Sequence, residues 1–205
     1  IENGIAEQDM VSVAGGLARQ GLLPVVNSFA AFLSSRANEQ IYNNATEETK
    51  IIYMNHYAGL IPAGPGKSHQ SLRDISLLTA LPNMTIIQPC CAEETRMALR
   101  WCVEKATGPC MIRLVIGPSP RKIGLPQDYT LEPGKGVVLK EGDEKAIIAY
   151  GPVMVHEALK AAEMRECDGK GTKIIGFPWL NTIDTSWVTE QLEKVQSITV
   201  VEDHH

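Results

Sequence analysis

The sequence lacks a long hydrophobic run, since no apolar segment approaches the roughly 20 residues that span a bilayer. It also shows no secretory signal at its start. Positive charge is in the minority, because 19 Lys and Arg stand against 24 Asp and Glu, for a formal net charge of −5 without a basic cluster. Nucleic acid and membranes are therefore not expected as partners.

The five cysteines lack the C-x-x-C spacing of a metal site, and their number is odd. Free thiols in a reducing compartment explain them most simply, so we expect a cytoplasmic protein. The chain begins with Ile1 and stops at His205, directly after a strand-like run. We therefore expect the C-terminal section or a split subunit of something longer.

The N-terminal stretch places one carboxylate before a helix-forming run. Glu7 is followed by apolar and small residues that share one helical face: Met10, Val13, Ala14, Leu17 and Ala18. Gly21 is expected to end this helix. Glu7 then lies in the first turn, where the helix dipole favours negative charge. Local sequence favours a half-exposed carboxylate, and a buried carboxylate with a ligand as its partner is the alternative.

Strand-like and helix-like segments alternate along the chain. We expect strands at residues 22–29, 50–55, 84–89 and 110–116, and helices at residues 30–44, 71–80 and 92–106. A proline-containing stretch without periodicity precedes a second alternating series at residues 136–201. The pattern predicts an α/β protein of two domains, a doubly wound, mostly parallel sheet with helices on both faces, followed by a smaller α/β domain.

A loop rich in glycine and proline occupies residues 58–67, after the strand at residues 50–55. Ligands of such sheets bind outside the carboxyl ends of strands, so this loop is a candidate functional element. His56 and His69 flank it and are suited to hydrogen bonding and proton transfer. A satisfied structural histidine is the alternative for each, and two histidines without a third ligand predict no metal site.

Several short motifs together resemble thiamine-diphosphate enzymes, and most closely the transketolase and 1-deoxyxylulose-5-phosphate synthase group. They are Gly4-Ile5-Ala6-Glu7-Gln8, Phe29 with Phe32, Gly66-Lys67-Ser68-His69-Gln70 before Asp74-Ile75, and Leu81-Pro82-Asn83-Met84 before a strand and Pro89. The resemblance covers nearly the whole chain. It implies a pyrimidine-binding domain at residues 1–122 that lacks its N-terminal strand, a linker at residues 123–135, and a truncated transketolase C-terminal domain at residues 136–205.

The resemblance implies that Glu7 binds and activates thiamine diphosphate. In this family the carboxylate hydrogen-bonds N1′ of the aminopyrimidine and favours the imino tautomer that takes the C2 proton, and a strong hydrogen bond in a dry site suits that role. Phe29 and Phe32 match its ring-stacking and pocket positions, with ordinary core packing as the alternative. His56 and His69 match positions that meet the substrate, so we expect them in catalysis and substrate binding.

Three departures from the family put the sugar-phosphate substrate in question more than the cofactor. An Asp-Gly pair usually precedes Thr-His-Gln, whereas residues 65–70 read Pro-Gly-Lys-Ser-His-Gln. The family's phosphate-binding arginine falls near Ile116, and Ser35 stands where an aromatic residue is common. Lys67 and Arg121 are the cations that we expect to bind substrate instead.

The Gly-Asp-Gly…Asn signature that holds the diphosphate through a divalent metal is absent from the sequence. We therefore expect a diphosphate-binding domain or subunit as partner, with Mg or Ca bound there, in a homodimer or heterotetramer. The implied function is transfer of a two-carbon ketol unit between sugar phosphates. Alternatives are 1-deoxyxylulose-5-phosphate synthesis, the beta subunit of a 2-oxoacid dehydrogenase, and a cofactor-free regulatory subunit.

Overall fold

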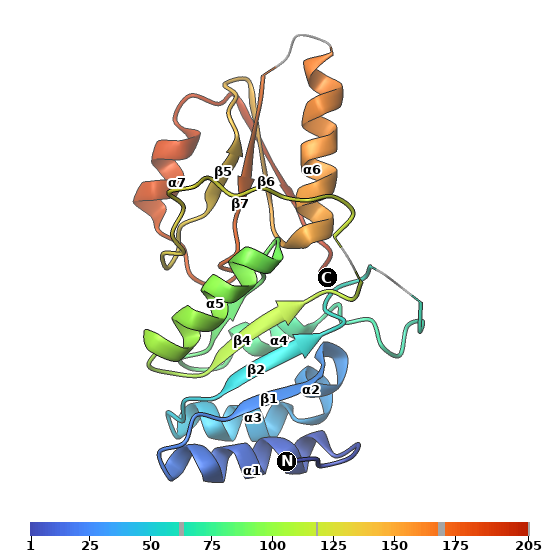
Figure 1. The fold of residues 1–205 in the computed structure, drawn as a ribbon, viewed down its shortest axis with the longest axis vertical. Coiled ribbons are helices and arrows are strands. Elements are labelled where there is room, and N and C mark those ends of the chain that lie inside the picture. The colour runs from blue at the N-terminus through green and yellow to red at the C-terminus, as the bar shows by residue number, and fades with distance from the viewer. Residues whose placement is uncertain (62–63, 118, 168–170, 205) are drawn as a thin grey trace. The chain divides into compact units, whose positions relative to one another are not determined.

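The computed structural model describes residues 1–61, 64–117, 119–167 and 171–204. The chain forms two compact units of alternating strands and helices (Figure 1). The first unit comprises Ile1–Ile87, Ala98–Gly117 and Asp203–His205, and the second comprises Gln88–Met97 and Pro118–Glu202. The units therefore do not follow chain order strictly, and the domain boundaries expected from the sequence remain a prediction.

A four-stranded parallel sheet forms the centre of the first unit. Its strands are β1 (Val25–Phe29), β2 (Ile52–His56), β3 (Thr85–Ile87) and β4 (Cys110–Leu114), in the order β1-β2-β4-β3. A parallel sheet covered on both faces needs continuous apolar strands. The central strands meet this need, with several fully buried residues: Ile52, Tyr53, Cys110, Met111 and Ile112.

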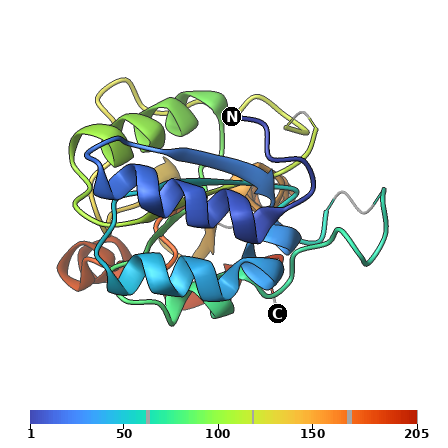
Figure 2. The same cartoon turned by 90° about the horizontal axis from the view of Figure 1, so that it is seen from below.

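Helices cover both faces of this sheet, as the alternation predicts. They are α1 (Glu7–Arg19), α2 (Ala30–Arg36), α3 (Asn38–Thr46), α4 (Asp74–Thr79) and α5 (Ala92–Glu104). In Figure 2, β1 lies between α3 on one side and α5 on the other.

The single helix expected at residues 30–44 is wrong, because the chain leaves helical geometry at Ala37, with φ −100° and ψ 16°. The two resulting helices differ in their packing partners. Helix α2 contacts both α1 and α4, whereas α3 contacts α1. A hydrogen bond supports the contact between α3 and α1, because Asn44 Nδ2 donates to the carbonyl of Val11 at 3.0 Å. One straight helix does not satisfy both contacts.

Gly21 terminates helix α1 as predicted, two residues after its last residue, Arg19. The backbone N–H groups of Gly21 and Leu22 donate to the carbonyls of Ala18 and Leu17, respectively. This is the Schellman arrangement, and it requires the left-handed φ of +84° that Gly21 adopts.

The second unit contains a mixed four-stranded sheet. Its strands are β5 (Val137–Lys140), β6 (Lys145–Ala149), β7 (Thr172–Gly176) and β8 (Ser197–Val201), in the order β5-β7-β6-β8 with only β5 antiparallel. The accompanying helices are α6 (Gly151–Glu166) and α7 (Thr185–Leu192). The core includes Ile147 and Ile174 from the strands and Val155, Ala158 and Ala162 from α6. This arrangement confirms the second, smaller α/β unit.

All five cysteines are free thiols, as predicted. Within the described residues, no helix combines the length and the apolar character needed to cross a membrane.

Candidate functional site

Five of the predicted site residues line a cavity of about 560 Å³ in the first unit. Its lining includes Glu7, Phe29, Phe32, His56 and His69, together with Gly4, Ile5, Asn27 and Ser28. The parallel register pairs Phe29 with His56 at the carboxyl ends of β1 and β2, which explains why residues far apart in sequence meet here. The cavity thus has the position in the sheet that the glycine-rich loop predicted.

Glu7 is buried at this cavity, with an exposed fraction of 4%. Its Oε1 accepts a hydrogen bond from Ser28 Oγ at 3.3 Å, and its Oε2 pairs with Arg36 Nη1 at 3.0 Å. Burial raises the pKa of Glu7, but its own backbone N–H, the Arg36 guanidinium and the Ser28 hydroxyl together outweigh burial and lower it. Glu7 is therefore ionised at neutral pH, and the half-exposed carboxylate favoured by local sequence is wrong.

Arg36 is the partner that sequence reasoning missed. Its guanidinium carbon lies 3.9 Å from the centroid of the Phe32 ring, so the same group pairs with Glu7 and covers an aromatic face. Phe32 and Arg36 are four residues apart on α2, a spacing that brings helical side chains together. In the sequence, this spacing of four residues is the one feature that indicates the contact between Phe32 and Arg36.

Aromatic rings form one wall of the cavity. The Phe29 ring lies 5.6 Å from Phe32 and 4.8 Å from Tyr57, and the Phe32 ring lies 5.1 Å from His69 in a nearly edge-on arrangement. Tyr57 was not predicted, and it adopts a φ of +59° that is uncommon for a non-glycine residue. Such rings offer flat apolar faces on which another aromatic ring can stack.

The two histidines differ in their surroundings. Burial lowers the pKa of His56, because an apolar environment disfavours the imidazolium form. His69 Nδ1 shares a hydrogen bond with Ser68 Oγ at 2.9 Å, and its backbone N–H donates to the carbonyl of Gly66. Residues 62–63 of the glycine- and proline-rich loop lie outside the described residues.

Lys67 and Arg121 do not line this cavity. Lys67 lines a neighbouring cavity of about 280 Å³ in the same unit. Arg121 belongs to the second unit, where its Nη1 pairs with Glu163 Oε1 at 2.8 Å. Their substrate-binding roles stay predictions. Across the described ranges, no group of three or more His, Cys, Asp or Glu side chains is placed to hold a metal ion.

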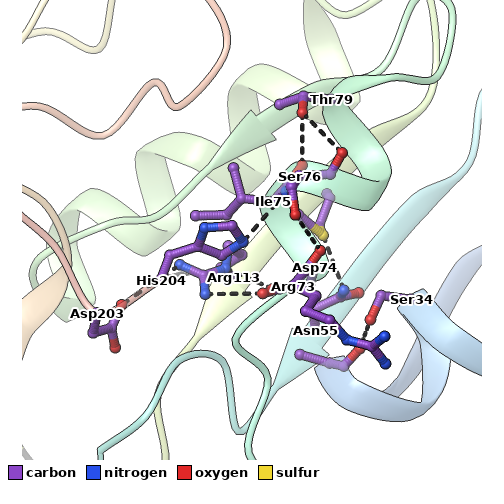
Figure 3. A network of polar contacts seen from close by, with 12 residues as sticks. Ser34, Asn55, Arg73, Asp74, Ile75, Ser76, Thr79, Arg113, Asp203 and His204 are labelled. Atoms are coloured by element: carbon purple, nitrogen blue, oxygen red, sulfur yellow. Dashed lines mark hydrogen bonds and ion pairs between the residues drawn. The ribbon is translucent and has the colours of Figure 1, made fainter.

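A buried ionic network fixes α4 to β4 (Figure 3). Arg113 on β4 donates to Asp74 through Nε at 2.7 Å and Nη2 at 3.1 Å, and both side chains are fully buried. Asp203 approaches the same guanidinium at 4.0 Å, and the Ser76 backbone N–H donates to His204 at 3.3 Å. The network holds in place the residues that precede α4, including Arg73.

Comparison with known families identifies the chain. Residues 1–115 match the model described as "Transketolase, pyrimidine binding domain", and residues 134–205 match "Transketolase, C-terminal domain". The chain belongs to the transketolase family. Both predicted fold types are therefore confirmed.

Curated transketolase-family relatives include 1-deoxy-D-xylulose-5-phosphate synthases. That of Rippkaea orientalis is 31% identical over 99% of this chain, and that of Clostridium botulinum strain Alaska E43 is 33% identical over 98% of it. An uncharacterized transketolase family protein of Sinorhizobium fredii, y4mN, is 32% identical over 98% of the chain. The chain spans 32% of the length of the first two relatives and 58% of the third.

Solved structures of the transketolase family share this fold. A structure described as "Split gene transketolase, inactive beta4 tetramer" is 32% identical, with a TM-score of 0.85 over 98% of this chain and 64% of that chain. Transketolase from Campylobacter jejuni is 20% identical, with a TM-score of 0.81 over 100% of this chain and 35% of that chain. The second likeness shows the fold alone.

Members of the transketolase family use thiamine diphosphate. The cavity of this chain fits the aminopyrimidine half of that cofactor, because it combines a buried, ionised carboxylate at Glu7 with aromatic faces at Phe29 and Phe32. The sequence carries no Gly-Asp-Gly…Asn signature for the diphosphate half.

Proposed function

We propose that this chain supplies the pyrimidine-binding half of an active site that transfers a two-carbon ketol unit between sugar phosphates. The supporting observation is the ionised carboxylate of Glu7, buried at a cavity whose wall includes Phe29 and Phe32. A carboxylate is rarely buried without a function or a partner, and perturbed carboxylates in cavities are candidates for catalysis.

When bound, thiamine diphosphate supplies a carbanion at C2 of its thiazolium ring. In the proposed site Glu7 would accept a charge-assisted hydrogen bond from N1′–H of the aminopyrimidine in its imino form, and a water-poor site would strengthen that bond. Phe29 and Phe32 hold the flat ring. His56, which burial keeps neutral, and His69 hydrogen-bond substrate hydroxyls and accept or return their protons.

The proposed enzyme needs a second polypeptide segment. A diphosphate-binding domain or subunit would hold the diphosphate together with Mg or Ca, in a homodimer or heterotetramer. The split-gene transketolase structure supports this arrangement, since its chain is similar over 98% of the present one and is described as an inactive beta4 tetramer. Five free thiols support a reducing, cytoplasmic location.

Synthesis of 1-deoxyxylulose 5-phosphate is the second candidate function. The observation in its favour is the 31–33% identity to 1-deoxy-D-xylulose-5-phosphate synthases over nearly the whole chain. A cofactor-free regulatory subunit is disfavoured, because Glu7, Phe29 and Phe32 remain together around one cavity. The beta subunit of a 2-oxoacid dehydrogenase is the least favoured alternative, because Ser68-His69-Gln70 with Asp74-Ile75 resembles the sugar-phosphate branch of the family.

Product analysis of the assembled enzyme separates these functions. The enzyme is incubated with thiamine diphosphate and magnesium, an aldose phosphate acceptor, and either a ketose phosphate or pyruvate as donor. Ketol transfer predicts a new ketose phosphate from the ketose donor and no carbon dioxide from pyruvate. Carbon dioxide release with a deoxyketose product supports the second candidate, and no thiamine-dependent product with either donor contradicts the proposal.

A further inference from the structure

The second cavity of the first unit is cationic. Its volume is about 280 Å³, and its lining includes Arg36 from α2 and Lys67 and Arg73 from the segment before α4. No Asp or Glu side chain lines this cavity in the described part of the chain. Arg36 is paired with Glu7, so Lys67 and Arg73 are the cations that give this lining its net positive charge.

Two of these cations have no acidic partner. No ion pair of Lys67 is present within the described residues, and Arg73 makes one side-chain contact, from Nη2 to Ser35 Oγ at 3.5 Å. The Arg73 backbone is nevertheless anchored, because its carbonyl accepts a hydrogen bond from Ser76 Oγ at 3.0 Å (Figure 3). Both side chains are therefore available to a ligand at a fixed position in the fold.

Serine residues complete the lining. Ser35, Ser68 and Ser71 line the cavity together with the cations. Ser71 has an exposed fraction of 2%, and its Oγ is closed to solvent. Ser35 and Ser68 are exposed, so their hydroxyls are the ones within reach of a ligand.

Ser35 keeps the cavity open. It is small and exposed, and it lines the cavity. A ring at this position would occupy space that the lining residues now enclose.

We propose that this cavity binds the phosphate group of a phosphate monoester, with Lys67, Arg73 and Arg36 neutralising its charge and the exposed Ser35 hydroxyl donating to one of its oxygens. Guanidinium and ammonium groups with a hydroxyl donor are the groups that bind phosphate most strongly in proteins. Arg36 also pairs with Glu7, so the anion shares a cation with the first cavity. Assigning the phosphate to the substrate rests on the proposed function, whereas the anion site itself does not.

Direct titration tests the site without the reaction. Inorganic phosphate is titrated into the assembled enzyme by calorimetry at constant ionic strength, without thiamine diphosphate or sugar. We expect saturable binding that weakens about tenfold in Lys67→Gln and in Arg73→Gln, and further in the double variant. Lys105→Gln is the matched control, because Lys105 is exposed and lines neither cavity.

A second variant acts by shape rather than charge. Ser35→Phe leaves all three cations and is expected to abolish phosphate binding by filling the cavity, with an unchanged midpoint of thermal unfolding. Wild-type phosphate affinity in Ser35→Phe or in the Lys67/Arg73 double variant would overturn the site, as would the absence of saturable binding to the wild type.

Kinetics then identifies the source of the phosphate. If the substrate supplies it, Lys67→Gln raises KM for a phosphorylated acceptor about tenfold and leaves KM for the unphosphorylated sugar unchanged. If KM does not change while phosphate binding is lost, the site is supported and its ligand is a separate phosphorylated effector. C2 proton exchange of the cofactor tests the proposed function separately, since it requires no sugar phosphate.

Discussion

Glu7 and Arg36 form an ion pair at the first cavity. The Glu7 side chain is 5% exposed and the Arg36 side chain is 43% exposed, so the carboxylate is shielded from water while its cation reaches the surface. The guanidinium also covers Phe32, one of the rings expected to hold a pyrimidine. A cation that is itself partly exposed therefore stabilises the ionised form of Glu7.

The ion pair predicts a pH-dependent stability difference. The folded-state pKa of Glu7 lies below its unfolded value of 4.5, so the stabilisation is present above pH 4.5 and is lost as pH falls through the folded pKa. Arg36→Gln should lower the free energy of unfolding by about 1 kcal/mol at pH 7, because Arg36 is partly exposed. Urea denaturation from pH 7 toward acid should show this difference shrinking, and a constant difference would contradict the assignment.

His56 predicts a titration that NMR can follow. Burial lowers its pKa below the ordinary value of 6.5, so His56 should be neutral at pH 7. The folded state then resists protonation, and its stability relative to the unfolded chain decreases as pH falls below 6.5. The His56 ring resonances should titrate with a midpoint below 6.5, and a midpoint above that value would contradict the buried environment.

Helix α4 is the element that connects the site to the core. Its first residue, Asp74, pairs with the fully buried Arg113 on β4, and Asp203 and His204 contact the same region of the first unit. Buried ion pairs add little net stability, but removing one partner leaves an uncompensated charge. The network therefore determines the position of α4 more than it adds to the stability of the unit.

Asp74→Asn should destabilise the protein by about 3–5 kcal/mol, because Arg113 then loses its bidentate carboxylate in a fully buried position. The measurement is the free energy of unfolding in urea. Asp128→Asn is the matched control, since Asp128 is exposed, and it should change stability by less than about 0.5 kcal/mol. Similar values for both variants would show that the buried pair is not formed.

Substitution of two glycines distinguishes the cost of backbone strain from the cost of a steric overlap. Gly21 and Gly59 both have a φ of +84°, but a Cβ at Gly21 meets open space, whereas one at Gly59 overlaps the Asp203 carboxylate. Gly21→Ala should cost about 1–2 kcal/mol from the left-handed backbone alone. Gly59→Ala should cost more, because Asp203 must also move. Equal losses in urea denaturation would contradict the docking of Asp203.

The sequence predicts the positions of the helices and strands well, but it predicts the breaks between successive helices less well. Alternating apolar and helical patterns locate the strands, and the left-handed glycine at position 21 marks the end of α1. The break at Ala37 was not predictable, because Ala37 is itself a good helix former and only the separate packing of α2 and α3 interrupts the helix there.

The chain forms two α/β units, and five of the predicted site residues line one cavity in the first of them. The motif residues Glu7, Phe29, Phe32, His56 and His69 could be predicted to meet, because parallel strands bring their carboxyl ends to one edge. Arg36 and Tyr57 could not, since their roles depend on side-chain geometry that no motif encodes. The burial of Glu7 also follows from tertiary packing, which local sequence does not show.

Exchange of the C2 proton of thiamine diphosphate in the assembled enzyme tests the central proposal most directly. The rate is measured by NMR after mixing with deuterium oxide, at saturating cofactor, for the wild type, Glu7→Gln and the surface control Lys105→Gln. We expect Glu7→Gln to slow exchange by about 10²–10⁴-fold, since a neutral amide replaces the activating carboxylate, and Lys105→Gln to match the wild type. Exchange at the wild-type rate in Glu7→Gln with the cofactor bound would contradict the proposed role of Glu7.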